Sequence, residues 1–368
     1  TRVTEWCFNI PFYDTLSFML NICDKIKYRY FDDKSVLWED TYIENIRVRI
    51  YDPVNATKTP QKNAKALILY FHGGGFFFGS VGSHDTMNYY LSKYSGTKII
   101  AVDYHLSPTV HYPVAVNQSI RVTRYILQHP QKYNIDPTRV FLAGDSAGAN
   151  LVIVIERYLH KELIYPIRAE ILLYPLLQMV NYMLPSYQKY LKYEILSVVT
   201  EDFLRNVPNY YLNATFDGSQ LFKNQHLSKQ DLNKFYSVIN KQWLNQSNIY
   251  KRSYDIDKLL PDDYYLMSTT SESHPDTSKL FHDDISPLLS SSNIISQTPS
   301  TFLVSCEYDT LQSDSLLYWE RLKEAHVEVE YKHYQIFHGA MTFVDWPVAF
   351  PDAFSIIEDS AAFIRKKI

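Results

Sequence analysis

The sequence predicts an α/β fold in which a mostly parallel central sheet carries helices on both faces. Two observations support this prediction. Short, continuous apolar segments alternate along residues 66–174 with longer segments that repeat apolar residues every three to four positions. After a gap, the same alternation resumes at residue 301. Alternating strands and helices of this kind are typical of a parallel sheet covered by helices, and a chain of 368 residues can hold one large domain or two small ones.

The first elements precede a glycine-rich loop. Residues 1–44 are expected to form amphipathic helix and loop, with Phe12, Leu16, Leu20 and Cys23 on one helical face. Residues 46–51 alternate apolar and charged side chains, which predicts a half-exposed strand. The continuous apolar run at residues 66–71 predicts a strand buried on both faces.

The elements that follow complete the α/β pattern. The predicted strands are 98–102, 140–143, 169–174, 301–305 and 327–334, and the predicted helices are 114–128, 147–160, 315–325 and 354–365. Residues 180–285 interrupt the pattern, because they are richer in Asn, Gln, Ser and Tyr and hold only weak helical stretches such as 201–212. We interpret them as an insertion into a domain made of residues 45–179 and 286–368, since the alternation resumes after them.

A nucleophile elbow is indicated by Gly144-Asp145-Ser146-Ala147-Gly148, which lies between the strand at 140–143 and the helix at 147–160. Small residues on both sides of a serine allow the sharp strand-to-helix turn that exposes its hydroxyl. The pentapeptide also occurs by chance, so its meaning depends on whether the chain supplies an oxyanion site, a base and an acid.

A glycine-rich segment, His72-Gly73-Gly74-Gly75-Phe76-Phe77-Phe78-Gly79, directly follows the buried strand at 66–71. Consecutive glycines leave backbone N–H groups unobstructed, as an oxyanion hole requires. A phosphate-binding loop is the alternative, because Gly74 and Gly79 have its spacing. Ser80 and Val81, however, stand where that loop needs Lys and Ser or Thr, so phosphate binding is disfavoured.

The acid and the base are expected to follow the serine in the order Ser, Asp, His. Asp309 comes at the end of the strand at 301–305, and His338 comes in the loop after the next strand. Both positions lie at the carboxyl ends of strands, where α/β folds place functional loops. The competing residues are less well placed: Glu307 is expected within the strand, Asp314 and His326 on helices or turns, and His333 within its strand.

Together these motifs resemble the hormone-sensitive-lipase branch of the α/β-hydrolases. The resemblance rests on His72-Gly73-Gly74-Gly75, Tyr104-His105-Leu106-Ser107-Pro108, Gly144-Asp145-Ser146-Ala147-Gly148, Tyr308-Asp309-Thr310-Leu311 and Phe337-His338-Gly339. Leu173-Tyr174-Pro175-Leu176-Leu177-Gln178 with Pro185-Ser186-Tyr187 is similar to the arylacetamide deacetylase and neutral cholesterol ester hydrolase group. The resemblance covers about residues 45–368 and is weakest between 190 and 285.

This resemblance implies roles for individual residues. Ser146 would be the nucleophile, Asp309 the acid and His338 the base, and the N–H groups of Gly74, Gly75 and Ala147 would form the oxyanion hole. Residues 1–44 and the insertion at 180–285 would form a helical cap over the substrate pockets.

Two segments depart from the family pattern. His105 and Ser107 stand where the family has Arg and Ala, and Gln312-Ser313 stands where it usually has Arg-Asp. Neither departure touches the three predicted catalytic residues, but both alter the packing expected around the loops.

Composition narrows the choice of function. A net charge of −4 and the lack of a dense Lys/Arg block disfavour nucleic-acid binding. No spacing of His, Cys or acidic residues indicates a metal site, and no cofactor is expected. The three cysteines, Cys7, Cys23 and Cys306, do not form a disulfide framework; a Cys7–Cys23 bridge and free thiols both stay open.

Location is indicated by weaker signals. Four glycosylation sequons begin at Asn55, Asn117, Asn213 and Asn245, and Asn117 falls on a predicted helix. Members of the family are typically anchored in the endoplasmic reticulum membrane with a lumenal catalytic domain, which the resemblance implies here through a segment upstream of Thr1. A secreted or cytoplasmic location stays open, as does the oligomeric state.

The sequence therefore predicts a serine carboxylic-ester hydrolase that acts on lipophilic esters or arylacetamides through an acyl-enzyme. A non-catalytic receptor or binding protein built on the same fold is the alternative from another class. A serine peptidase is a third possibility, which the glycine-rich segment disfavours.

Overall fold

The structure is a computed structural model, and it describes residues 34–54, 64–162, 167–191, 199–240, 243, 269–344 and 350–368. The predicted helical face with Phe12, Leu16, Leu20 and Cys23, and hence the pairing of Cys7 and Cys23, lies outside these residues. Cys306 is a buried free thiol, and burial raises its pKa.

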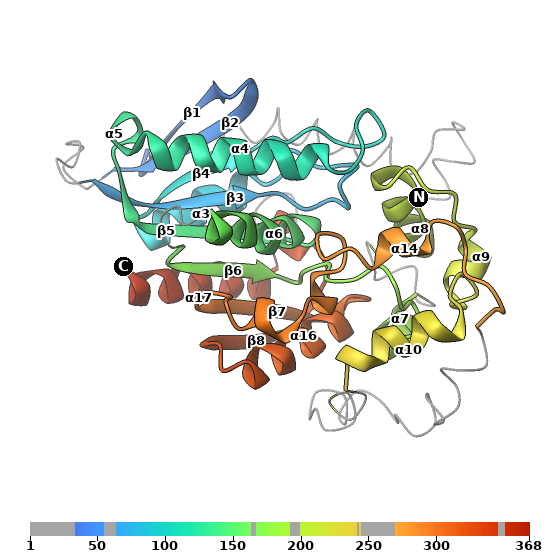
Figure 1. Cartoon of the computed structure of the whole chain (residues 1–368). Helices are drawn as coiled ribbons and strands as arrows, with labels where there is room; N and C mark the ends of the chain where they lie inside the picture. Colours follow the sequence, from blue (N-terminus) through green and yellow to red (C-terminus); the bar gives the residue numbers. More distant parts are fainter. Residues whose placement is uncertain are drawn as a thin grey trace, which may run out of the picture.

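One eight-stranded sheet forms the centre of the molecule (Figure 1). Its strands are β1 (Val36–Ile43), β2 (Ile46–Pro53), β3 (Lys65–Phe71), β4 (Lys98–Val102), β5 (Ile135–Asp145), β6 (Ala169–Leu173), β7 (Thr301–Tyr308) and β8 (Val329–Phe337). The spatial order is β1-β2-β4-β3-β5-β6-β7-β8. The pairs β1/β2 and β2/β4 are antiparallel and all others are parallel, which confirms the predicted fold class.

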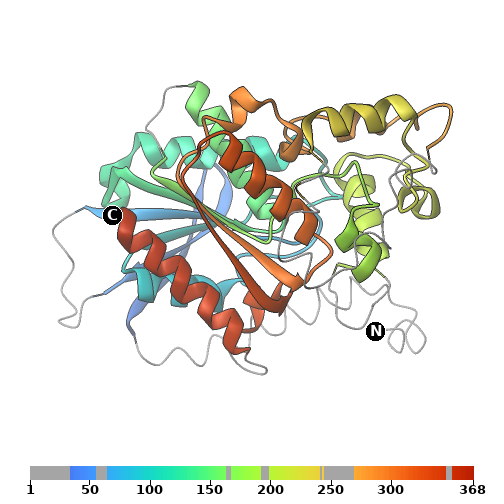
Figure 2. The ribbon, with the colours of Figure 1, turned by 90° about the horizontal axis from the view of Figure 1, so that it is seen from below.

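Helices cover both faces of the sheet, as Figure 2 shows. One face carries α4 (Val114–Gln128), α6 (Ala147–Lys161) and α16 (Gln312–Glu324), and the other carries α3 (Asp85–Ser95) and α17 (Pro351–Lys367). Strand β3 shows why both faces need cover: Leu67 and Leu69 join the buried cluster on the first face, and Ile68 and Tyr70 join that on the second. The short elements are α5 (Pro130–Tyr133), η2 (Pro287–Leu289), α15 (Ser292–Ile295) and η3 (Ala340–Phe343).

Strand β1 corrects the assignment of residues 1–44 to helix and loop. Residues 36–43 pair with β2 along their whole length. The pattern was missed because β1 is an edge strand whose middle residues are exposed, so the apolar alternation of a half-buried strand is lost. Asp40 on this strand binds the guanidinium groups of Arg47 and Arg49 on β2, at 2.7 and 2.6 Å.

The insertion at 180–285 is helical where it is described, with α7 (Pro185–Tyr190), α8 (Glu201–Tyr211), α9 (Gly218–Leu221), α10 (Lys229–Val238) and α14 (Thr277–Leu280). These helices gather at one end of the sheet (Figure 1). Thr200 caps α8 by accepting from Phe203 N, and Ser228 forms a capping box with Asp231 at the start of α10. Tyr187 and Phe203 are buried in the same apolar cluster as the first face of the sheet, so the insertion shares that core.

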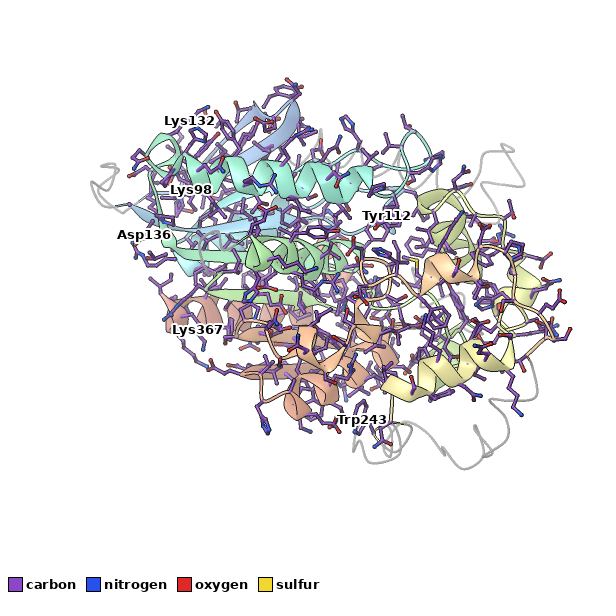
Figure 3. All side chains as sticks on the ribbon, in the orientation of Figure 1. Lys98, Tyr112, Lys132, Asp136, Trp243 and Lys367 are labelled. Atoms are coloured by element: carbon purple, nitrogen blue, oxygen red, sulfur yellow. The ribbon has the colours of Figure 1, made fainter. Side chains whose placement is uncertain are left out.

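Tyr112, which is labelled in Figure 3, connects the α/β domain to the insertion through hydrogen bonds. Its N–H donates to the carbonyl of Tyr211 (2.7 Å) and its hydroxyl donates to Asp284 (3.0 Å). Because Tyr211 ends α8 and Asp284 follows α14, two parts of the insertion are hydrogen-bonded to this one residue, one through its backbone and one through its side chain.

Candidate active site

Ser146 occupies a strained turn between β5, which ends at Asp145, and α6, which begins at Ala147. Its backbone has φ 52° and ψ −118°, a combination that non-glycine residues rarely adopt. The turn also packs tightly, because a Cβ on Gly148 would overlap the carbonyl oxygens of Phe71 and His72. The Ser146 N–H donates to the carbonyl of Leu173 (2.9 Å), which fixes the turn against β6.

Ser146, His338 and Asp309 are brought together although they lie far apart in the chain. The Ser146 Oγ is 3.0 Å from Nε2 of His338, and Nδ1 of that ring is 2.9 Å from Oδ2 of Asp309. The second oxygen of Asp309 accepts from Leu311 N–H at 2.8 Å, and the ring of Tyr174 packs edge-on against the imidazole at 4.8 Å. This is the geometry of a nucleophile, a base and an orienting acid.

The competing acids and histidine are placed elsewhere. Glu307, within β7, pairs with Nε2 of His333 at 2.9 Å. Asp314, within α16, accepts from Gln178 and Tyr187 at 3.2 and 3.1 Å. Both acids thus have partners outside the Ser146–His338 pair.

The glycine-rich segment lies beside the nucleophile elbow, and its backbone has the positive φ angles that glycine adopts readily. Gly74 and Gly75 have φ values of 114° and 61°, which a side chain would disfavour. Within the described ranges, the N–H groups of Gly74, Gly75 and Ala147 have no hydrogen-bond acceptor. Ala147 is the first residue of α6, where a helix leaves its N–H groups unpaired.

Asp145 connects the elbow to the glycine-rich segment, and sequence reasoning did not single it out. Its carboxylate accepts from Gly73 N–H (2.8 Å) and from the hydroxyl of Tyr70 (2.5 Å), and it lies 3.2 Å from Nε2 of His84. Burial acts to raise its pKa, but His84 and the Tyr70 hydroxyl more than offset this, so the pKa of Asp145 is lowered. The carboxylate is therefore ionised. Through its hydrogen bond with Gly73 it holds the glycine-rich segment next to the nucleophile elbow.

His72 extends this polar layer. Its ring stacks on Tyr104 with centroids 4.3 Å apart, and the Tyr104 hydroxyl donates to its carbonyl at 2.6 Å. Burial and the neighbouring His84 lower the pKa of His72 to about 4, so its ring is neutral at pH 7.

Residues at both departures from the family pattern form hydrogen bonds with neighbouring elements. The backbone N–H of His105 donates to Oε1 of Gln118 on α4, and Nδ1 of His105 accepts from Nε2 of the same amide, each at 2.9 Å. Ser313 lies 2.7 Å from the hydroxyl oxygen of Ser186 on α7.

Helix α8 covers the glycine-rich segment with aromatic side chains. Phe76 stacks on Tyr211 (3.8 Å between centroids), and Phe77 packs on Phe203 at 5.2 Å. A Cβ on Gly75 would lie only 2.7 Å from the tip of the Phe203 ring. The insertion thus supplies an apolar wall next to the candidate oxyanion donors.

Other predicted features are partly described. Asn213 and Asn117 are exposed, the latter on α4, while Asn55 and Asn245 lie outside the described residues. In the part of the chain that the structure describes, no helix is long and apolar enough to cross a membrane. No cluster of three or more His, Cys or acidic side chains suited to a metal ion occurs there either.

Comparison with known proteins agrees with this geometry. Residues 68–239 and 243–342 match the family described as having the alpha/beta hydrolase fold. The chain belongs to this α/β-hydrolase family. Its relatives place it in the arylacetamide deacetylase and neutral cholesterol ester hydrolase group of the hormone-sensitive-lipase branch, as the motifs predicted.

Two relatives illustrate that placement. The hydrolase is 32% identical to arylacetamide deacetylase-like 3 of Mus musculus over 339 residues, 91% of this chain and 79% of that protein. It is 28% identical to neutral cholesterol ester hydrolase 1 of Bos taurus over 325 residues, 84% and 75% of the two chains. Among solved structures, a thermostable carboxylesterase cloned from a metagenomic library superposes with a TM-score of 0.70 at 20% identity, covering 96% of this chain and 97% of that one. At that identity the superposition supports the fold alone.

Proposed function

We propose that this α/β-hydrolase is a serine carboxylic-ester hydrolase that acts on lipophilic esters or arylacetamides through an acyl-enzyme. The observation that carries the proposal is the continuous contact from Ser146 Oγ through the His338 ring to Asp309. The relatives point the same way, since they are named as arylacetamide deacetylases and a cholesterol ester hydrolase.

In the first half of the reaction, His338 Nε2 takes the proton of Ser146 as Oγ attacks the substrate carbonyl carbon. Asp309 accepts the Nδ1–H of His338, which fixes the tautomer and stabilises the imidazolium. The oxyanion that forms would be stabilised by the unpaired N–H groups of Gly74, Gly75 and Ala147.

In the second half, the imidazolium of His338 protonates the leaving alcohol or amine, and the acyl group stays on Ser146. His338 then takes a proton from water, the resulting hydroxide attacks the acyl carbon, and the proton returns to Ser146 Oγ as the acid leaves. The aromatic side chains of α8 beside Gly75 would give the acyl-enzyme apolar surroundings suited to lipophilic substrates.

Ser146→Ala tests the assignment of the nucleophile. We expect kcat for a short-chain p-nitrophenyl ester to fall by about 10⁴- to 10⁶-fold, and labelling by a fluorophosphonate probe to disappear. Ser219→Ala, which removes an exposed hydroxyl on α9, serves as the control and should retain both properties. A Ser146→Ala protein that hydrolyses the ester at the parental rate would refute the assignment. A folded parental protein that is neither labelled nor active would instead support the non-catalytic alternative, and a panel of aminoacyl substrates would reveal a peptidase.

We further propose a lumenal location in the endoplasmic reticulum, as the family resemblance implies. The exposed sequon at Asn213 supports it, because the asparagine lies in a turn shortly after α8 and not within a helix. The sequon at Asn117 is less suited, since it lies within the helix α4.

A further inference from the structure

The loop that carries Asp309 is held from two sides by the insertion. Ser186, at the start of α7, donates its hydroxyl to the carbonyl of Thr310 at 2.5 Å. Its oxygen accepts from the Ser313 N–H at 3.0 Å, and the Ser186 N–H donates to the hydroxyl of Ser313 at 3.1 Å. The two hydroxyl oxygens are 2.7 Å apart, and the hydroxyl of Thr310 donates to the carbonyl of Val199 at 3.3 Å.

This set of contacts is out of reach of water. Ser186, Thr310 and Ser313 are all fully buried. A buried hydrogen-bonding group that loses its partner cannot replace it with solvent, so each contact constrains the backbone between residues 310 and 313 strongly.

The same backbone orients the carboxylate of Asp309. Leu311, between the two residues that Ser186 holds, donates its N–H to Oδ1 of Asp309, and this leaves Oδ2 facing His338. A displacement of the turn would therefore move the carboxylate relative to the imidazole. We propose that Ser186 of the insertion is a positioning residue for catalysis, which acts on His338 through the turn at 310–313 and Asp309.

This inference rests on the proposed function and deepens it. It also accounts for one departure from the family pattern: Ser313 stands where the family usually has Asp, and its small hydroxyl fits against that of Ser186 within hydrogen-bonding distance.

Ser186→Ala tests the proposal directly, because it removes the hydroxyl with little change in side-chain volume. We expect kcat to fall by about 10- to 100-fold and KM to stay within about twofold of the parental value. Ser313→Ala keeps the contact between Ser186 and Thr310, so its loss should be smaller. Ser92→Ala is the matched control, since Ser92 is an equally buried serine whose hydroxyl donates to a backbone carbonyl at 2.9 Å on the opposite face of the sheet.

A pH profile separates positioning from a general loss of packing. The acidic limb of kcat/KM reports the ionisation of the base in the free enzyme. A weaker contact with Asp309 stabilises the imidazolium less, so this limb should move to lower pH in Ser186→Ala and stay in place in Ser92→Ala. We follow the acidic limb because burial raises the pKa of the neighbouring Asp314 to about 8, so the titration of Asp314 would overlap with the basic limb.

The outcomes are distinct. A folded Ser186→Ala protein with parental kcat and an unmoved acidic limb overturns the proposal, and Ser313→Ala decides by the same criteria if Ser186→Ala does not fold. If the parental protein has no esterase activity, the proposed function fails, and the inference is then judged by NMR titration of His338. A lower pKa of His338 in Ser186→Ala than in the parental protein supports the inference, and equal values overturn it.

Discussion

Asp145→Asn should impair both stability and turnover, because one carboxylate connects the strand that carries Ser146 to the loop that carries Gly74. The substitution keeps the shape of the side chain and removes its charge. Two hydrogen bonds, from Gly73 N–H and the Tyr70 hydroxyl, lose a charged acceptor, and the amide group that replaces one oxygen faces His84.

The magnitude follows from those three contacts. A hydrogen bond to a charged partner contributes about 1 kcal/mol more than a neutral one, so the two bonds and the contact with His84 together correspond to a loss of about 3 kcal/mol in the free energy of unfolding. Displacement of the donor loop by a fraction of an ångström should lower kcat by about 10- to 100-fold.

The pH dependence of stability has a defined sign. Because the folded-state pKa of Asp145 is lowered, its stabilising effect is present above the unfolded pKa and is lost as pH falls through the folded value. The difference in stability between the parental protein and Asp145→Asn should therefore shrink as the pH falls below about 4.

Urea unfolding at several pH values, combined with p-nitrophenyl ester kinetics, measures both effects. Asp352→Asn is the control, since this aspartate is exposed in the first turn of α17. If Asp145→Asn matches Asp352→Asn in unfolding free energy and in kcat, the carboxylate does not hold the donor loop and the reasoning is wrong.

Two further predictions concern stability and location. Burial, with a contribution from Glu156, raises the pKa of Glu170 to about 8. Between about pH 4.5 and 8 the folded state therefore keeps a proton that the unfolded state has lost. The free energy of unfolding should fall by up to about 1.4 kcal/mol per pH unit as the pH rises through that range. Glu170→Gln should flatten this slope in urea unfolding, and an unchanged slope would contradict the assignment. In eukaryotic cells that express the protein in the endoplasmic reticulum, endoglycosidase H should lower its apparent mass, and Asn213→Gln should remove one step of that shift; an unchanged pattern would exclude Asn213 as a glycan site.

The parts of the site that local sequence encodes were predictable. Helix α4 begins and ends at the predicted residues 114 and 128, because its apolar face is regular and Pro113 precedes it. The positions of Ser146 and Asp309 were predictable because each follows a strand with a continuous apolar segment, and His338 follows the next strand along the chain; their catalytic roles stay a prediction.

Features that depend on distant partners were not predictable. Asp145 carries no local signal, because its partners Tyr70 and His84 are 75 and 61 residues away in the chain. Helix α3 was missed since several of its buried positions are polar, among them Asp85 and Asn88, so its apolar periodicity is weak.

Two separate sets of hydrogen bonds hold the candidate site, one made by Asp145 and one made by Ser186. The oxyanion side is held by Asp145, whose partners all lie on β3, the glycine-rich segment and the residue just before α3, within the α/β domain. The acid side is held by Ser186, which belongs to the insertion. The insertion also supplies the aromatic side chains over Gly75, so a bound substrate can change how the insertion packs. Such a change would shift the turn at 310–313 and with it Asp309. The loop that carries Gly74 would stay in place, because Asp145 holds it. Substrates that fit the insertion differently should therefore differ in kcat through the Asp309–His338 contact, an effect that Ser186→Ala should reduce.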